Sequence, residues 1–163
     1  MKRTVFALIV AAVAGCYNEK VEVRGYIDKT VSLIQESRQI GTAFGTRIGP
    51  WLAGQQVDVG QLNRELETTK RRYYEIHDEI RRLRCPNNRL ALEYQKELLA
   101  YIDLEEDWFA NDLTSICNTI ASNNPADPTT IYIVQSRIHA LTEESLGVAE
   151  RLAVLASRAG SQW

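Results

Sequence analysis

Two histidines are the side chains of this sequence best suited to hold a transition metal or to move a proton near neutral pH. In helical bundles that bind metals, a glutamate commonly lies three residues before such a histidine, so that both side chains project inward. Tyr74 occupies that position before His77, and Ser136 occupies it before His139. The sequence therefore predicts no metal site of this type, and it indicates no other cofactor.

An acidic run is the second group that could bind a cation. It contains Asp103, Glu105, Glu106, Asp107 and Asp112. Such a run is more often a solvated helix face whose carboxylates pair with basic residues of a neighbouring helix. An antiparallel neighbour would bring Arg64, Lys70 and Arg71 to about this level. We therefore expect surface ion pairs here in place of a metal site.

Cys85 and Cys117 could form a disulfide in an exported protein. If one helix runs over 88–122, they lie near its opposite ends, some 45 Å apart, whereas a disulfide needs Cα atoms within about 7 Å. We therefore expect no bridge within one chain, with Cys117 buried beside Ile116 and Cys85 in a turn. A bridge between the Cys85 residues of two molecules stays open as an alternative.

Four arginines cluster around a predicted connection between helices. They are Arg81, Arg82, Arg84 and Arg89. Cations are favourable at the carboxyl end of a helix, where the last carbonyl groups carry partial negative charge. The same arginines form a candidate membrane-proximal basic patch, because each basic side chain near anionic lipid contributes about 1 kcal/mol.

Trp51 and Leu52 lie in a predicted loop that is bounded by glycines. Two interpretations stay open for them. They cap the end of the core, or they are exposed and form a candidate partner-binding site, since tryptophan is enriched at binding hot spots.

The first sixteen residues have the composition of an export signal. Lys2 and Arg3 give a positively charged start. The apolar run over 5–13 is too short to cross a hydrocarbon core of about 30 Å. It ends in a branched aliphatic residue, two small residues and a cysteine, namely Val13, Ala14, Gly15 and Cys16.

This order resembles the lipobox of bacterial lipoproteins. The resemblance covers residues 1–16 only. It implies that residues 1–15 are a cleaved signal peptide and that Cys16 carries lipid, which tethers the mature chain to a membrane. Two or three acyl chains anchor stably, because each buried methylene contributes about 0.8 kcal/mol. The alternative is an ordinary secretory signal that leaves Cys16 as a thiol.

The resemblance also bears on location within the cell envelope. In Gram-negative lipoproteins, an aspartate directly after the cysteine commonly signals retention in the inner membrane, and Tyr17 occupies that position here. The periplasmic face of the outer membrane is therefore implied for a Gram-negative source. The extracytoplasmic face of the cell membrane is implied otherwise.

The rest of the chain, 16–163, has the size of one domain. Apolar residues recur at intervals of three and four over about 18–48, 59–83, 88–122 and 127–155. Gly49 and Pro50 are expected to end the first helix, and Asp58 to cap the second. Asp127, followed by a proline, is expected to begin the fourth. These segments predict an all-α protein, and the short connections favour an up-down-up-down four-helix bundle with long helices.

Such a bundle has two poles. Few residues separate Cys16 from the first helix, so the start of that helix, the connection around 85–88 and the carboxyl end are expected at a membrane-proximal pole. The connections over 49–60 and 123–128 are expected at the distal pole.

Charge and motifs limit the classes of function. Without residues 1–15, 17 basic residues remain against 21 acidic ones, a net charge of −4, which argues against nucleic acid as a partner. Haem-attachment, phosphate-loop and nucleophile-elbow motifs are absent, and no spacing of serine and histidine selects a catalytic set. We therefore expect no enzyme activity.

The resulting prediction is a membrane-anchored structural or protein-interaction module of the cell envelope, with an envelope protein as its partner. A ligand- or metal-binding helical bundle is one alternative. A secretion accessory is another, on a resemblance to the small helical pilotin lipoproteins in size and class alone.

Overall fold

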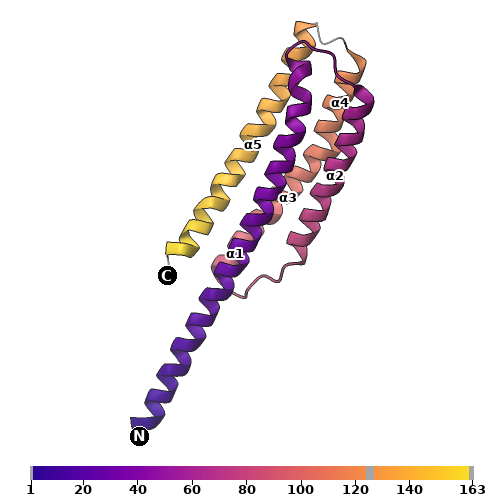
Figure 1. Ribbon diagram of the computed structural model, residues 1–163. Helices are drawn as coiled ribbons and strands as arrows, with labels where there is room; N and C mark the ends of the chain where they lie inside the picture. Colours follow the sequence, from indigo (N-terminus) through magenta and orange to yellow (C-terminus); the bar gives the residue numbers. More distant parts are fainter. Residues whose placement is uncertain (1, 124–126, 162–163) are drawn as a thin grey trace.

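The computed structural model describes the backbone of residues 2–123 and 127–161, and the side chains of residues 19–123 and 127–158. Within these ranges every regular element is a helix, which confirms the predicted all-α class. The elements are α1 (Lys2–Leu52), α2 (Val59–Arg82), α3 (Arg89–Asp107), the π-helical turn η1 (Trp108–Asp112), α4 (Leu113–Ser122) and α5 (Pro128–Ser161). Helix α1 packs against α2 and α5, α3 packs against α5, and α2 packs against α4 (Figure 1).

Three helices begin at the residues that their capping side chains predict. The Asp58 carboxylate accepts a hydrogen bond from the Gln61 backbone N–H at 2.9 Å, and Asn88 accepts one from the Leu90 backbone N–H at the same distance. Asp127 accepts hydrogen bonds from two backbone N–H groups in the first turn of α5. These side chains satisfy N–H groups that have no partner within their own helices.

Helix α1 does not end at Gly49 and Pro50, as the sequence predicts, but continues past both. Pro50 is inside the last turn. The helix stops because Gly54 has a φ of 78°, in the left-handed region that favours glycine. The Gly54 N–H donates to the Trp51 carbonyl oxygen at 2.9 Å, and the Gln55 N–H donates to the Pro50 carbonyl oxygen at 3.0 Å. This pair of bonds is a Schellman motif, which closes the end of the helix.

The third predicted helix spans the expected range, but it contains the wide turn η1. In this turn the Leu113 N–H donates to the Trp108 carbonyl oxygen, five residues back. The Thr114 hydroxyl donates to the Phe109 carbonyl oxygen at 3.1 Å. Such side-chain bonds to the backbone compete with the regular α-helical pattern, which gives a physical reason for the irregularity.

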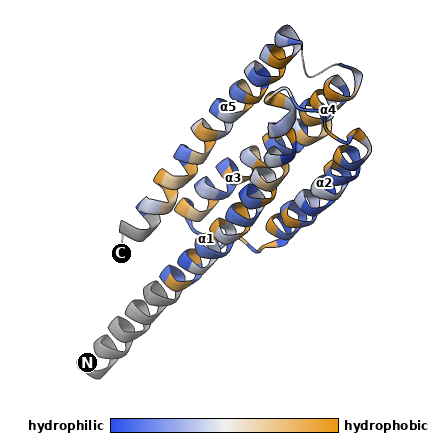
Figure 2. Cartoon of the chain, turned by 45° about the horizontal axis from the view of Figure 1, so that its top comes forward, coloured by the Kyte–Doolittle hydropathy of each residue, from blue (hydrophilic) through white to orange (hydrophobic). Residues whose placement is uncertain are grey.

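Two apolar clusters form the core. The first, named here the Tyr94 cluster, includes Val23, Ile34, Ile76, Tyr94, Leu98, Ile102 and Leu152. The second, named the Trp51 cluster, includes Phe44, Ile48, Trp51, Leu62, Leu66, Ile116 and Val134. Hydrophobic and hydrophilic residues are interspersed along the helices (Figure 2). An amphipathic helix shows this pattern, because its apolar residues recur every three or four positions. Both clusters draw on α1, α2 and α5, so the molecule has an apolar region toward each end.

Candidate functional site

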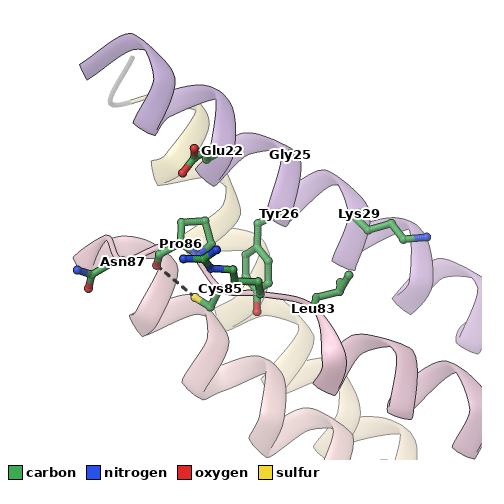
Figure 3. A pocket seen from close by; sticks show the side chains of 9 residues that line it. Glu22, Gly25, Tyr26, Lys29, Leu83, Cys85, Pro86 and Asn87 are labelled. Atoms are coloured by element: carbon green, nitrogen blue, oxygen red, sulfur yellow. Dashed lines mark hydrogen bonds between the residues drawn. The ribbon is translucent and has the colours of Figure 1, made fainter. Parts of the chain in front are cut away.

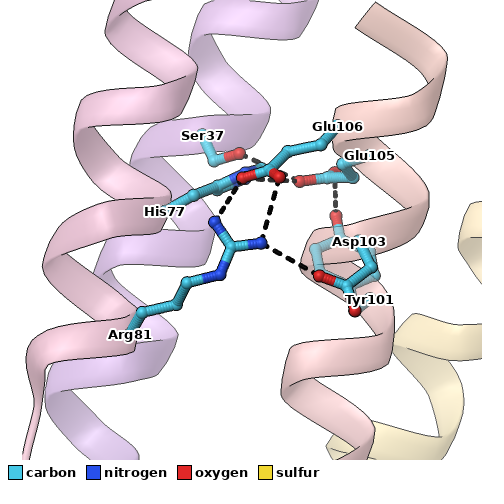
Figure 4. Close-up of polar contacts among 7 residues, drawn as sticks. All are labelled: Ser37, His77, Arg81, Tyr101, Asp103, Glu105 and Glu106. Carbon is cyan, nitrogen blue, oxygen red and sulfur yellow. Dashed lines mark hydrogen bonds and ion pairs between the residues drawn. The ribbon is translucent and has the colours of Figure 1, made fainter. Parts of the chain in front are cut away.

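A group of buried polar side chains, named here the polar layer, lies among the apolar residues of the core. Its central side chains are Ser37 of α1, His77 of α2 and Glu105 of α3, which are between 1% and 3% exposed. Along α2, His77 lies between Ile76 and Ile80 of the Tyr94 cluster, and Ser37 and Glu105 each follow a member of that cluster by three residues. The layer therefore brings three helices together through hydrogen-bonding groups in the middle of the core (Figure 4).

Glu105 is the centre of the layer. Its carboxylate accepts hydrogen bonds from the Tyr101 hydroxyl and, at 3.2 Å, from the Ser37 hydroxyl, and it lies 3.3 Å from the Nε2 atom of His77. A buried carboxylate is costly unless such partners replace water. Burial raises the pKa of Tyr101 to about 12, and the negative charge of Glu105 adds to the shift, so Tyr101 stays a hydrogen-bond donor.

His77 lies between two carboxylates. Its Nδ1 atom is 3.2 Å from Oε1 of Glu106, and its Nε2 atom faces Glu105. A neutral imidazole has one N–H, whereas a protonated imidazole has two. A carboxylate can only accept, so the ring nitrogen is the donor wherever one of these contacts is a hydrogen bond, and the tautomer decides which nitrogen carries the proton.

Arg81 closes the outer side of the layer. Its guanidinium donates to both carboxylate oxygens of Glu106, at 2.5 and 3.0 Å, and to Asp103 at 2.9 Å. Burial alone would raise the pKa of Glu106, but the hydrogen bonds and charge of Arg81, together with His77, outweigh it and lower that pKa. Glu106 is therefore an anion at neutral pH.

Aromatic packing holds the imidazole on its other side. The rings of Tyr73 and His77 meet edge to face with centroids 5.2 Å apart, and Tyr73 also packs on Phe109 with centroids 3.9 Å apart. A Cβ atom at Gly41 would lie 3.2 Å from the Tyr73 hydroxyl oxygen. The absence of a side chain at Gly41 thus leaves room for Tyr73 in the layer.

The buried polar side chains of the layer bind one another. His77 and Glu105 are almost fully buried, and the contacts within the layer occupy their polar atoms. Within the parts of the chain that the structure describes, no three His, Cys, Asp or Glu side chains are grouped as a metal ion would require. The layer is a hydrogen-bonded polar network that joins α1, α2 and α3.

The expected role of the acidic run is wrong for Glu105, which is buried and not part of a solvated face. Three other acids of the run do form ion pairs: Asp103 and Glu106 with Arg81, and Asp112 with Arg137 of α5 at 2.7 Å. Among the described residues, the expected basic partners do not pair with the run: Arg64, Lys70 and Arg71. The register differs because apolar packing places the His77 level of α2, and not an earlier one, beside the run.

The four clustered arginines do not form one free patch. Arg81 faces the polar layer, Arg82 pairs with a carboxylate one turn before it, and Arg89 pairs with a carboxylate one turn after it. In the described part of the chain, Arg84 is the member of this group that has no carboxylate partner. Arg82 and Arg89 remain largely exposed in these surface pairs, so a membrane contact of the basic patch stays a prediction.

Trp51 is 1% exposed, so the interpretation of an exposed partner-binding tryptophan is wrong for this conformation. It packs in the cluster named after it, and Leu52 is partly buried against the same cluster. The Trp51 Nε1 atom has no hydrogen-bond partner among the described atoms. Burial follows because α1 continues to Leu52, which turns the indole toward α2 and α4 and not into a loop.

The cysteines were the remaining residues singled out in the sequence. Cys85 and Cys117 are both free thiols, and they pack against different apolar clusters. Burial raises the pKa of Cys117 to about 11. Cys16 lies outside the residues whose side chains are described, so its acylation stays a prediction.

Fold and layer together define an all-helical protein with a polar network inside its core. No protein-family model matches the sequence, and no curated protein and no solved structure is significantly similar to it. Across the described residues, no helix combines the length and the apolar character needed to cross a bilayer.

Proposed function

We propose that this chain is a lipid-anchored protein of the bacterial cell envelope, whose helical body is a non-enzymatic structural or protein-interaction module. The observation that carries the proposal is the lipobox-like order of Val13, Ala14, Gly15 and Cys16 behind a short charged and apolar segment. The periplasmic face of the outer membrane is the proposed location if the source is Gram-negative.

The proposed architecture is an up-down-up-down four-helix bundle. Its support is that consecutive helical segments pack against each other and that their connections, 53–58, 83–88 and 123–127, are short. The meeting of Ser37, His77 and Glu105 at one level adds a cross-helix constraint.

The tether and the packed body are close in sequence. Val23, seven residues after Cys16, is fully buried in the Tyr94 cluster. At about 1.5 Å per helical residue, this separation is on the order of 10 Å. Glu19 accepts a hydrogen bond from the Asn88 side chain at 2.8 Å, which joins the start of the body to the connection over 83–88. That end of the body would therefore lie next to the membrane.

The non-enzymatic part of the proposal is supported by what the polar side chains already do. The carboxylates, imidazole and hydroxyls of the polar layer bind one another and hold α1, α2 and α3 together. Groups that are buried and paired in this way contribute to helix pairing and do not approach a substrate.

Metabolic labelling with a palmitate analogue tests the anchor. The wild-type chain should incorporate the label and fractionate with membranes, whereas Cys16→Ser should not incorporate it and should leave an uncleaved or soluble product, because the thiol is the acyl acceptor. Cys85→Ser is the matched control and should label like the wild type. Equal labelling of the wild type and Cys16→Ser would overturn the proposal.

A spin label on Cys85 tests the bundle topology. In the proposed arrangement, Cys85 and Leu155 approach the same apolar cluster. NMR signals of the last turns of α5 should therefore broaden, while those near Val134 should not. The reverse pattern would exclude the up-down order.

A further inference from the structure

A pocket of about 620 Å³ lies between α1 and the connection over 83–88 (Figure 3). Tyr26 reaches from α1 toward the connection, and Leu83 and Pro86 add apolar surface. Gly25 forms part of the wall, and a Cβ atom there would meet nothing within 4 Å. The pocket is therefore open space at the end of the body that begins near Cys16.

Three charged side chains line the pocket. Arg84 lines it and is exposed, without a carboxylate partner in the described part of the chain. Lys29 also lines it and forms an ion pair with Glu79 at 2.8 Å, in which half of each side chain is exposed. Glu22 contributes one negative charge to the wall. Arg84 is thus the cation that is available to a ligand.

Two exposed apolar side chains lie at the same end of the body. Val21, on α1, is 53% exposed, and Leu92, in the first turn of α3, is 48% exposed. The hydrogen bond from Asn88 to Glu19 joins the part of α1 near Val21 to the start of α3. Exposed apolar residues beside a cation are suited to the boundary between head groups and acyl chains of a membrane.

We propose that this pocket binds the phosphate head group of an anionic phospholipid, with Arg84 as the residue that recognises the charge. The inference rests on the proposed anchor at Cys16, which places the pocket next to a membrane surface. Tyr26 and Leu83 contact the glycerol portion, and Val21 and Leu92 meet the lipid surface around the pocket.

Cys85 provides a native reporter, because it lines the pocket and is partly exposed, whereas Cys117 is buried. The full-length chain is purified in a neutral sugar detergent, and the alkylation rate of Cys85 is measured by mass spectrometry. Soluble dihexanoyl phosphatidylglycerol should protect the thiol, and at ten times its dissociation constant it should slow alkylation about tenfold.

Substitution variants test whether Arg84 recognises the head group. Other ligands test whether the phosphate must belong to an anionic lipid. Arg84→Gln should lose the protection, each rate being compared with the same variant without lipid. Arg82→Gln is the matched control, since Arg82 is exposed on the same helix end and pairs with Asp78. Dihexanoyl phosphatidylcholine and inorganic phosphate, at the same concentration, should protect little.

Three results would overturn the proposal. They are absence of protection by phosphatidylglycerol, equal protection by phosphatidylcholine or free phosphate, and equal loss of protection in Arg84→Gln and Arg82→Gln. The assay in detergent does not require an acyl chain on the protein. If the palmitate-labelling experiment failed, the proposed lipid anchor would be wrong. The alkylation assay would still test lipid binding by the pocket.

Discussion

The Nε2 atom of His77 lies 3.3 Å from the Oε2 atom of Glu105, and both side chains are almost completely buried. This contact joins α2 to α3 inside the core, beside residues of the Tyr94 cluster. A buried pair of this kind is sensitive to the loss of one partner, since the other stays inside the protein without compensation.

Glu105→Ala should lower the free energy of unfolding by about 3–5 kcal/mol, because His77, Tyr101 and Ser37 lose a shared acceptor. Urea denaturation measures the effect. Glu93→Ala is the control, since Glu93 forms an exposed pair with Arg89 and should cost about 0–1 kcal/mol. Equal costs for the two variants would show that the layer does not hold the helices together.

Removing both partners should be milder than removing one. The double variant His77→Leu with Glu105→Leu replaces the buried pair by apolar side chains, a change that is often neutral or stabilising in other proteins. We expect it to be more stable in urea than Glu105→Ala. A double variant less stable than Glu105→Ala would mean that the polar contacts themselves, and not the relief of an unpaired group, dominate.

The spacing of Glu105 and His77 along their helices indicates that both face the core, although charged and polar residues are not usually expected there. Glu105 follows Ile102 by three residues and precedes Phe109 by four, so it falls on the inner stripe of its helix. His77 is next to Ile76 on the inner face of α2. Carboxylates are usually exposed, and their partners are on other helices, so the sequence pattern alone does not show that Glu105 is buried.

Structural features that depend on neighbouring residues could be predicted from the sequence, whereas features that depend on distant residues could not. Asp58, Asn88 and Asp127 start their helices as predicted, because capping depends on neighbouring residues. The burial of Trp51 depends on side chains from α2 and α4, which are distant in the sequence. The division into four helical segments was thus predictable from the sequence, while the register between the helices was not.

The pH dependence of stability should reflect Arg81 and Glu106. The pKa of Glu106 is lowered from 4.5 in the folded protein, so its ion pair contributes stability above that pH and loses it as pH falls through the folded value. The difference in unfolding free energy between the wild type and Arg81→Gln should therefore be largest above pH 4.5 and shrink below it. Arg89→Gln, at an exposed pair, should show little pH-dependent difference. A gap between the wild type and Arg81→Gln that stays constant into acid would contradict this assignment.

Trp51 should behave as a core residue. Trp51→Ala should cost about 3–5 kcal/mol of stability, as is typical of a buried tryptophan. Trp51→Phe keeps an aromatic ring and removes the Nε1 donor, which has no partner. Because an unsatisfied buried donor costs about 1–3 kcal/mol, the phenylalanine variant should lose less than about 2 kcal/mol. If Trp51→Ala were as stable as the wild type in thermal or urea unfolding, Trp51 would not be a core residue. It would again be a candidate for an exposed partner-binding side chain.

Two glycines in the same region should respond in opposite directions to substitution by alanine. Gly54 has a φ of 78°, and its N–H closes the end of α1 through the Trp51 carbonyl group. Alanine in this left-handed conformation costs roughly 1–2 kcal/mol, so Gly54→Ala should lower the urea midpoint. Gly45 is helical and exposed, and a Cβ atom there would meet nothing within 4 Å.

Gly45→Ala should therefore stabilise the protein by about 0.5–1 kcal/mol, because alanine loses less conformational entropy in a helix. Unfolding curves of both variants should keep the wild-type dependence on urea concentration, which would show that only stability has changed. If both substitutions shifted the midpoint in the same direction, α1 would not end at Gly54. The helix would then stop nearer Gly49 and Pro50, and Trp51 would lie in a loop.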